Sequence, residues 1–453
     1  MEQRSRGLRR TLLGASLLVA AVALVASVDD VRTYGGEDLR PRVLGARALL
    51  AGLDPYTYEV TPATPETLLD YTRPFARITR CTYSPALLFL YGPLSDLPWG
   101  AQRAVWAALE WAALLGTALV LSRCLRRARD REALFIVAGL GFAGSYFFRL
   151  HVERGQAYVF LALLLSLWCA LILRPPGGAG ARDGAWSGVP LGLAIALRPS
   201  LAVLIPIAFL LGLRRSSLAA LVAAAAVGIT LPLAGVAGWL QFVRHAGLIG
   251  RWALRDPATL SMLGAPVPVP ARLEGYDFSR VLPGLSGNTA LGGVLQAAAT
   301  AARSTGALHA LARWWPPASQ ALALAAVAAT LAVALRAGLR HRALRTRLAL
   351  ALVAALLVDY FLPIRIAYAD VLFLPPLALL LPALAARRPP RAAGLLILSG
   401  FACGAALLTV SWRIGYPGAL LRSALVMAGM LGACVWLSHP RPGGARAGPV
   451  AAP

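Results

Sequence analysis

Long apolar segments recur along most of this chain and constrain its fold more than any other feature. Crossing about 30 Å of hydrocarbon takes about 20 apolar residues in a helix, which satisfies its own backbone hydrogen bonds there. The predicted spans are residues 11–28, 102–122, 132–150, 157–173, 216–238, 318–336, 347–362, 368–386, 392–410 and 418–437. Between the fourth and the fifth, "LRPS" divides residues 188–213 into two short helices. The sequence therefore predicts an all-α, polytopic membrane protein with about ten transmembrane helices and a broken helical hairpin.

Arginine supplies every basic side chain and gathers in alternate loops. The clusters are residues 4–10, 123–132, 213–215, 336–347, 386–391 and 441–446. Placing all of them in the cytosol satisfies the positive-inside rule, provided that residues 188–213 enter the membrane and return on the same side. We therefore predict a multi-pass protein of the cell membrane with both termini in the cytosol. The net charge of +24 does not indicate nucleic-acid binding, because no base-stacking aromatic residues accompany the arginines.

This topology predicts a single membrane domain, residues 1–437, followed by a flexible cytosolic tail, residues 438–453. It leaves two large outer segments, residues 29–101 and 239–316. Acidic residues are concentrated in the first of these. Since orientation does not depend on acidic residues, they indicate either a solvated loop that balances its own arginines or a functional site.

A short helix is predicted just after the first span, in "EDLRPRVLGARALLAGLDPY" (37–56). Residues 40–51 favour helix, Pro41 is tolerated in the first turn, and Gly52 is positioned to end the helix. One face carries Val43, Ala46 and Leu50. That pattern suits a helix lying on the outer membrane surface.

Asp38 lies at the N-terminal end of this helix, where the helix dipole and the free backbone N–H groups stabilise a carboxylate. Two roles are open for it. It either caps the helix or accepts a proton from a substrate hydroxyl. Asp29 and Asp30, which directly follow the first span, are the second choice for such a base, and otherwise form a polar end to the apolar run.

Several short motifs follow in a fixed order. They are Asp38 with "GARALLAGLDPY" (45–56), "TYSPALLFLYGPLSDLP" (82–98), Gly155-Gln156 at the start of a span, "GLAIALRPS" (192–200) and "SGNTALGG" (286–293). This series, over roughly residues 12–385, resembles glycosyltransferase family 87, whose members have the GT-C fold. The chain departs from the family pattern at "RPR" (40–42), where members have an aromatic residue, and at "LPIRIAYAD" (362–370), where it has no histidine.

The resemblance implies a glycosyltransferase that moves a sugar, often mannose, from a polyprenyl monophosphate carrier to an envelope glycolipid or glycan on the outer face. Substitution at the anomeric carbon passes through a transition state that resembles an oxocarbenium ion. It needs a base for the incoming hydroxyl and cations for the departing phosphate. The resemblance assigns Asp38 as that base in an inverting reaction, with Asp30 and Asp29 as alternatives.

The candidate ligands of the donor phosphate or substrate are Arg198, His151, Arg154, Gln156, Asn288 and Tyr83. Arginine suits the leaving phosphate because it can hold it with paired hydrogen bonds. Arg198 interrupts an apolar hairpin, so it has either this role or a structural one, which is snorkelling or pairing with Asp359 or Asp370. Arg154 has a structural alternative in a surface pair with Glu153.

Asn288 lies in a Gly-rich loop that is predicted to cover the site, although Asn and Gly are also common turn formers. No cofactor and no metal are predicted, since no carboxylate cluster requires an ion. The expected partners are the lipid-linked sugar donor, a lipid or glycan acceptor and membrane lipids. A membrane transporter or lipid flippase is the alternative, because broken helices often mark substrate sites in carriers. A structural protein without chemistry would explain neither outer segment.

Overall fold

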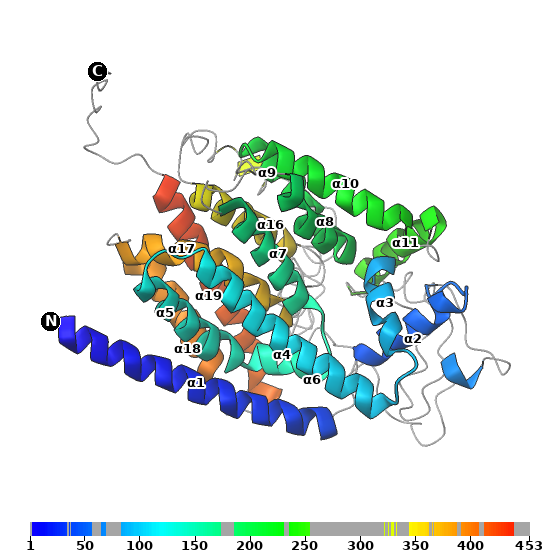
Figure 1. Cartoon of the computed structure of the whole chain (residues 1–453), viewed down its shortest axis with the longest axis horizontal. Helices are drawn as coiled ribbons and strands as arrows, with labels where there is room; N and C mark the ends of the chain where they lie inside the picture. The colour runs from blue at the N-terminus through cyan, green and yellow to red at the C-terminus, as the bar shows by residue number, and fades with distance from the viewer. Residues whose placement is uncertain are drawn as a thin grey trace, which may run out of the picture.

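The computed structural model describes residues 2–33, 36, 38–56, 65–68, 83–173, 185–230, 235–253, 321, 325, 328–329, 332, 344–361, 365, 367–386, 391–406 and 412–438. Every regular element within these ranges is a helix, which confirms the all-α class for the described part of the chain. Figure 1 shows most of the helices running alongside one another in a bundle, with α1 along one side.

The first half of the bundle consists of α1 (Glu2–Thr33), α4 (Trp99–Arg123), α5 (Ala128–Ile136), η3 (Val137–Ala143), α6 (Tyr146–Arg154) and α7 (Tyr158–Leu173). The second half consists of η4 (Ala185–Ser187), α8 (Gly188–Leu197), η5 (Pro199–Val203), α9 (Leu204–Leu210), α10 (Arg214–Thr230), α11 (Gly235–Ala253), α16 (Leu344–Phe361), η8 (Ala367–Phe373), α17 (Leu374–Ala386), α18 (Arg391–Ala406) and α19 (Trp412–Ser438). Between α1 and α4 lie α2 (Leu39–Leu50), η1 (Glu66–Leu68), α3 (Pro85–Tyr91) and η2 (Gly92–Leu94). Of these, α2 and α3 lie at the end of the bundle away from the N-terminus of α1 (Figure 1).

Two described helices, α1 and α4, are long and apolar enough to cross a membrane, and a third span results if a bent pair is taken as one. The membrane character of the chain is thus supported, and the number of about ten spans stays a prediction. The predicted span 132–150 is not a straight helix. The segment 128–143 and α6 meet at 61°, with η3 wound as a π-helix between α5 and the bend. At Gly139 within η3, a Cβ would lie 1.9 Å from Ser16 Oγ, so this segment approaches α1 too closely for a side chain.

The predicted break in residues 188–213 is present. α8 ends at Leu197, Arg198 is extended with φ −139° and ψ 91°, and the chain resumes in η5 and α9. Both ends of the segment lie beside the start of α10: a Cβ at Gly188 would meet Ser216, and Leu213 directly precedes α10. Both ends of the segment therefore lie beside the beginning of α10, and the orientation of the chain in the membrane stays a prediction.

One large apolar core joins α4 to α9 with α16, α17 and α19. Trp168 is fully buried there, and its Nε1 donates to Ser216 Oγ at 2.9 Å, so its polar atom is satisfied. A smaller core cluster forms at the other end, where Leu39, Val43 and Ala46 of α2 pack against α3 and α4. This packing holds the candidate site to the bundle.

The outer segments differ from prediction in two respects. α1 continues to Thr33, so Asp29 and Asp30 belong to its last turns and not to a loop that follows it. α2 forms as predicted, but Val43 and Ala46 face protein and the arginines at 40 and 42 are also buried. α3 and α4 thus cover Val43 and Ala46, whereas Leu50 of the same predicted face is 46% exposed, and the position of this helix relative to the membrane stays a prediction. Most of the second outer segment and the tail after 438 lie outside the described residues, and α11 covers 239–253.

Candidate active site

Asp38 immediately precedes α2, and its side chain does not cap that helix. Its backbone has φ −92° and ψ −18°, and it makes no side-chain hydrogen bond to the first turn. Instead, Asp38 Oδ2 accepts a hydrogen bond from Gln156 Nε2 and lies 3.7 Å from Arg154 Nη1. The capping alternative is therefore wrong, and the carboxylate is directed toward the turn between α6 and α7.

The Asp38 carboxylate is only partly enclosed. Its side chain is 22% exposed. Among the described residues, no hydrogen bond reaches Oδ1, while both polar contacts of the side chain go to Oδ2. A carboxylate that is held by a hydrogen bond and is still partly exposed can accept a proton from a positioned hydroxyl.

Gly155 shapes the turn that brings Arg154 and Gln156 to Asp38. It ends α6 in the left-handed region with φ +69°, a conformation that glycine adopts without steric cost. A Cβ at Gly155 would also lie 2.7 Å from Leu39 Cβ. The backbones join at this point, because Asp38 N–H donates to Arg154 O at 3.2 Å. The close approach of α2 to this turn thus requires glycine.

Arg42 is the buried centre of the site. Its Nη1 donates to Gly155 O at 2.5 Å and to Tyr91 Oη at 3.3 Å, and its Nη2 donates to Tyr83 Oη at 2.8 Å and to Gln156 Oε1 at 2.5 Å. The guanidinium also lies over the Tyr83 ring, 4.1 Å from its centroid. Burial alone would lower the pKa of Arg42, but interactions led by those with Tyr83 and Tyr91 raise it above its ordinary value. Arg42 therefore remains a cation although it is buried.

Arg42 orients Gln156 and, through it, Asp38. Arginine is only a hydrogen-bond donor, so it must face the amide oxygen of Gln156. The amide nitrogen then points to Asp38 Oδ2, to which it donates. The three side chains form one chain of hydrogen bonds from α2, through the α6–α7 turn, back to the start of α2.

Arg198 forms an ion pair with Asp359 of α16. Its Nε donates to Ser200 Oγ at 3.0 Å, and its guanidinium lies 4.5 Å from the centroid of the Tyr158 ring. Of the two predicted pairing partners of Arg198, Asp359 is therefore confirmed. The ion pair accounts for this arginine in the break between α8 and η5.

Asp359 connects Arg198 to a larger buried network. Arg365 Nε lies 3.4 Å from Asp359 Oδ2, and Arg365 Nη1 donates to Asp370 Oδ1 at 2.6 Å. Arg422 of α19 pairs with the other oxygen of Asp370. Within the described residues, this network holds three arginines and two aspartates and so carries one excess positive charge. An excess cation among apolar helices favours an anion in the vicinity.

A pair of tyrosines lies beside Arg198. The rings of Tyr158 and Tyr368 are 5.3 Å apart between centroids, and the guanidinium of Arg198 lies over the Tyr158 ring. Ser84, which follows Tyr83, donates from Oγ to Leu197 O at 2.9 Å. The segment that carries Tyr83 therefore meets the end of α8 directly before Arg198.

His151 differs from the other candidates because it lies inside the core. Its side chain is fully buried, with Nδ1 2.8 Å from Glu110 Oε1, and Nε2 accepts from Val159 N–H at 3.1 Å. Both ring nitrogens thus face protein groups of α4 and α7. This arrangement suits a residue that positions α6 and not one that contacts a substrate.

The alternative bases are arranged differently from Asp38. Asp30 is nearly buried and forms two hydrogen bonds of 2.7 Å with Arg149, which tie α1 to α6. Asp29 is exposed in the same part of α1. Asp30 is therefore engaged in a structural ion pair. The candidate Asn288 lies outside the described residues.

Sequence reasoning missed Arg42, Tyr158, Tyr368 and Arg365 as parts of this region. The sequence marked Arg42 only as part of a departure from the family pattern, because it belongs to the "RPR" found where members have an aromatic residue. Arg365 and Tyr368 likewise belong to the stretch that lacks the family's histidine. The described part of the chain contains no group of three or more His, Cys, Asp or Glu side chains that could hold a metal ion.

Comparison with known families adds independent support for the resemblance. The model of glycosyltransferase family 87 matches residues 82–363, more than half of the chain, and starts beyond Asp38. A search of curated proteins finds no match. The matched range covers Arg198 as well as Tyr83 and Gln156, both of which accept hydrogen bonds from Arg42. The protein is thus a membrane glycosyltransferase that belongs to glycosyltransferase family 87.

Proposed function

We propose that this protein transfers a sugar, with mannose as the first candidate, from a polyprenyl monophosphate carrier to an envelope glycolipid or glycan. The reaction takes place at the outer face of the cell membrane, with both termini in the cytosol. In it, the acceptor oxygen forms a bond to the anomeric carbon, and the bond from that carbon to the carrier phosphate breaks. The proton of the acceptor hydroxyl passes to Asp38, and the phosphate leaves on its lipid.

The arrangement of Asp38 carries this proposal. Gln156 holds Oδ2, Arg42 holds Gln156, and the carboxylate remains partly exposed. A base must be fixed in orientation before the reaction and must still reach its substrate. Since Asp38 neither caps α2 nor is enclosed in a buried ion pair, its position is better explained by proton transfer than by support of the helix.

Cations near this carboxylate suit the departing phosphate. Arg154 lies 3.7 Å from Asp38 and is itself 25% exposed, so it can contact both the base and a bound anion. Arg198 belongs to the network in which, among the described residues, three arginines meet two aspartates. We assign both arginines to the donor phosphate, because guanidinium groups bind phosphate oxygens in pairs. Tyr83, which accepts from Arg42, completes the polar side of the site.

The test is sugar transfer by the full-length protein in liposomes, with a labelled polyprenyl-phosphate sugar as donor. Asp38→Asn keeps the shape of the side chain but cannot accept the proton, so turnover is expected to fall by about 100-fold or more. Asp30→Asn is the matched control, because Asp30 already pairs with Arg149. Activity in Asp38→Asn together with an inactive Asp30→Asn would move the base to Asp30.

The transporter or flippase alternative is examined in the same liposomes. Movement of the labelled lipid between leaflets is measured without an acceptor. A protein that moves the lipid but forms no new glycosidic bond with any acceptor fraction of the envelope would contradict the transferase proposal.

A further inference from the structure

A cavity of about 630 Å³ lies between α1 and α4, next to the start of α2. Its lining consists of Leu24, Ser27, Val28, Val31, Arg32, Arg40, Trp99, Gly100, Arg103, Ala104, Ala107, Ala108 and Trp111. The α1 residues recur at helical spacing along one face. On α4, small residues at 100, 104, 107 and 108 leave space where larger side chains would fill the groove. Neither Asp38 nor Arg198 belongs to this lining, so the cavity is distinct from the candidate active site.

The cavity has a charged end and an apolar end. Arg32, Arg40 and Arg103 lie where α1 ends and α4 begins, whereas Leu24 and Trp111 lie deeper along the two helices. At 1.5 Å of rise per residue, the lining extends over roughly 12 Å of α1 and roughly 18 Å of α4. That length is about half of a 30 Å hydrocarbon layer. A molecule with an anionic head and an apolar chain matches this distribution.

The arginines are held in position by protein contacts. Arg103 is almost fully buried and donates from Nη1 to Val152 O at 3.2 Å and from Nη2 to Glu153 O at 3.0 Å. Its Nε has no hydrogen-bond partner among the described residues. Arg40 lies over the Trp99 ring, 4.0 Å from the centroid.

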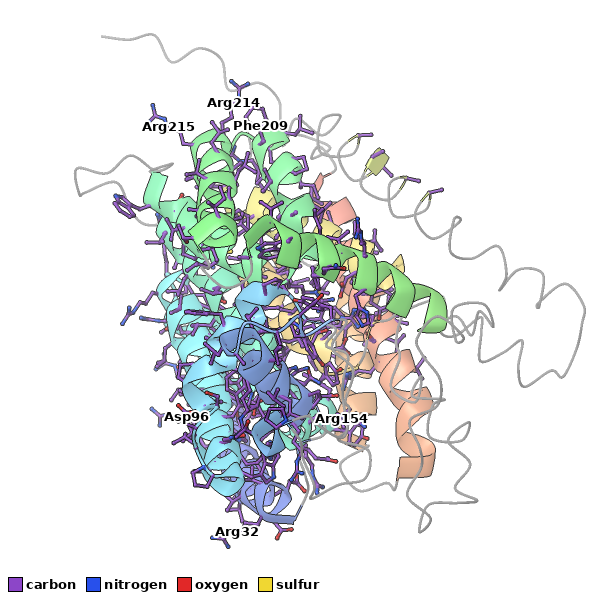
Figure 2. All side chains as sticks on the ribbon, turned by 90° about the vertical axis from the view of Figure 1, so that its right-hand side faces the viewer. Arg32, Asp96, Arg154, Phe209, Arg214 and Arg215 are labelled. Carbon is purple, nitrogen blue, oxygen red and sulfur yellow. The ribbon has the colours of Figure 1, made fainter. Side chains whose placement is uncertain are left out.

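No acidic side chain lines the cavity within the described part of the chain. In Figure 2, Arg32 projects at the lower edge of the molecule, at the opposite end of the view from Arg214 and Arg215. Three arginines at one end of this lining, next to two helices that can cross a membrane, give that end the positive charge that attracts anionic lipid headgroups.

We propose that this cavity binds an anionic glycerophospholipid of the surrounding bilayer, with the phosphate among Arg32, Arg40 and Arg103 and an acyl chain along the apolar walls. The apolar length of the cavity favours a lipid over free phosphate, which would leave those walls without a partner. The site is independent of the proposed sugar transfer, because it uses none of the residues assigned to that reaction. The bound lipid would connect α1 and α4 to the start of α2, through Arg40.

The test is lipid retention by the purified full-length protein in detergent, measured by native mass spectrometry with dioleoyl phosphatidylglycerol or dioleoyl phosphatidylcholine. The variant Arg32→Gln with Arg40→Gln removes two charges and is expected to weaken phosphatidylglycerol binding on the order of 30-fold. The matched control is Arg214→Gln with Arg215→Gln, which removes the same charge from exposed positions far from the cavity. It is expected to bind like the wild type.

A second variant tests the apolar part with all arginines present. Ala104→Phe with Ala108→Phe fills the α4 side of the cavity, and both alanines are exposed in the structure. It is expected to lose phosphatidylglycerol as well. The proposal is refuted by equal retention of the two lipids, by equal loss in the Arg214 and Arg215 control, or by undiminished binding in the filled variant. Displacement of phosphatidylglycerol by polyprenyl phosphate would also refute it, since the cavity would then belong to the donor.

Discussion

Gln156→Glu tests whether activity depends on how Asp38 is oriented and not only on its presence. The new side chain has the same shape and still accepts from Arg42, whose Nη2 lies 2.5 Å from Oε1 in the native protein. At the other end, however, an oxygen replaces the nitrogen that donates to Asp38 Oδ2. Two carboxylates then meet at hydrogen-bonding distance, and they cannot both stay ionised without cost.

The magnitude follows from the exposure of this site. Two like charges about 4 Å apart repel by about 1 kcal/mol in water and by about 4 kcal/mol near a protein surface. Asp38 is 22% exposed, so a value within this range applies. Each 1.36 kcal/mol corresponds to one pH unit, so the acidic limb of the rate–pH profile should move upward by roughly 1 to 3 units. Because a proton shared by the pair disables the base, activity is lost as the pH falls and recovers as it rises.

The assay is the initial rate of sugar transfer in liposomes across roughly pH 5 to 9, compared with Gln156→Leu. The leucine variant removes the donor without adding a charge, so its rate should fall without this displacement of the acidic limb. If Gln156→Glu has the wild-type profile, or loses activity equally at every pH, then Gln156 does not act on the base.

Three further substitutions test other parts of the site. Arg42→Lys removes the guanidinium that contacts Gly155 O and Gln156 Oε1 together. Turnover should therefore fall by roughly 10- to 100-fold, with little change in KM for the donor. A changed KM with normal turnover would contradict a positioning role. Gly155→Ala places a side chain at φ +69° and against α2. The free energy of unfolding, measured by thermal unfolding in detergent, should therefore fall by about 1 to 3 kcal/mol. An unchanged melting temperature would show that the turn is not constrained. Arg198→Ala should raise the donor KM by about tenfold or more. Asp359→Asn, which removes the charged partner of Arg198 but keeps the arginine, should not raise it. Equal effects of the two variants would indicate a purely structural ion pair.

Local signals account for much of the fold. Pro41 and Gly52 bound α2 as predicted, since one is tolerated in a first helical turn and the other ends the helix with φ +73°. The break at Arg198 was also predictable, because Pro199 disfavours helical geometry in the residue before it. The bend between η3 and α6 was not, and at this bend Gly144 meets a distant segment, since a Cβ there would lie 2.2 Å from Val19 of α1.

The sequence predicted several residues of the candidate site but not the contacts between them. Asp38, Gln156 and Arg198 belong to motifs that resemble the family, and the position of Asp38 before a helix also suited a residue that only caps that helix. In the structure, the Asp38 carboxylate instead accepts a hydrogen bond from Gln156, which lies 118 residues later in the sequence. Arg42 could not be assigned from its neighbours, because its partners come from three other segments.

By itself, the sequence determined an all-helical membrane protein, the helix after the first span and the residues available for glycosyl transfer. Hydrophobic periodicity, caps and breakers act over a few residues, so they are readable without the fold. Only the tertiary structure decided that α2 is buried, that Asp30 is paired with Arg149 and that Asp38 is oriented by Gln156 and Arg42. These outcomes depend on which side chains meet across helices, and burial and hydrogen bonding over such distances leave no local pattern in the chain.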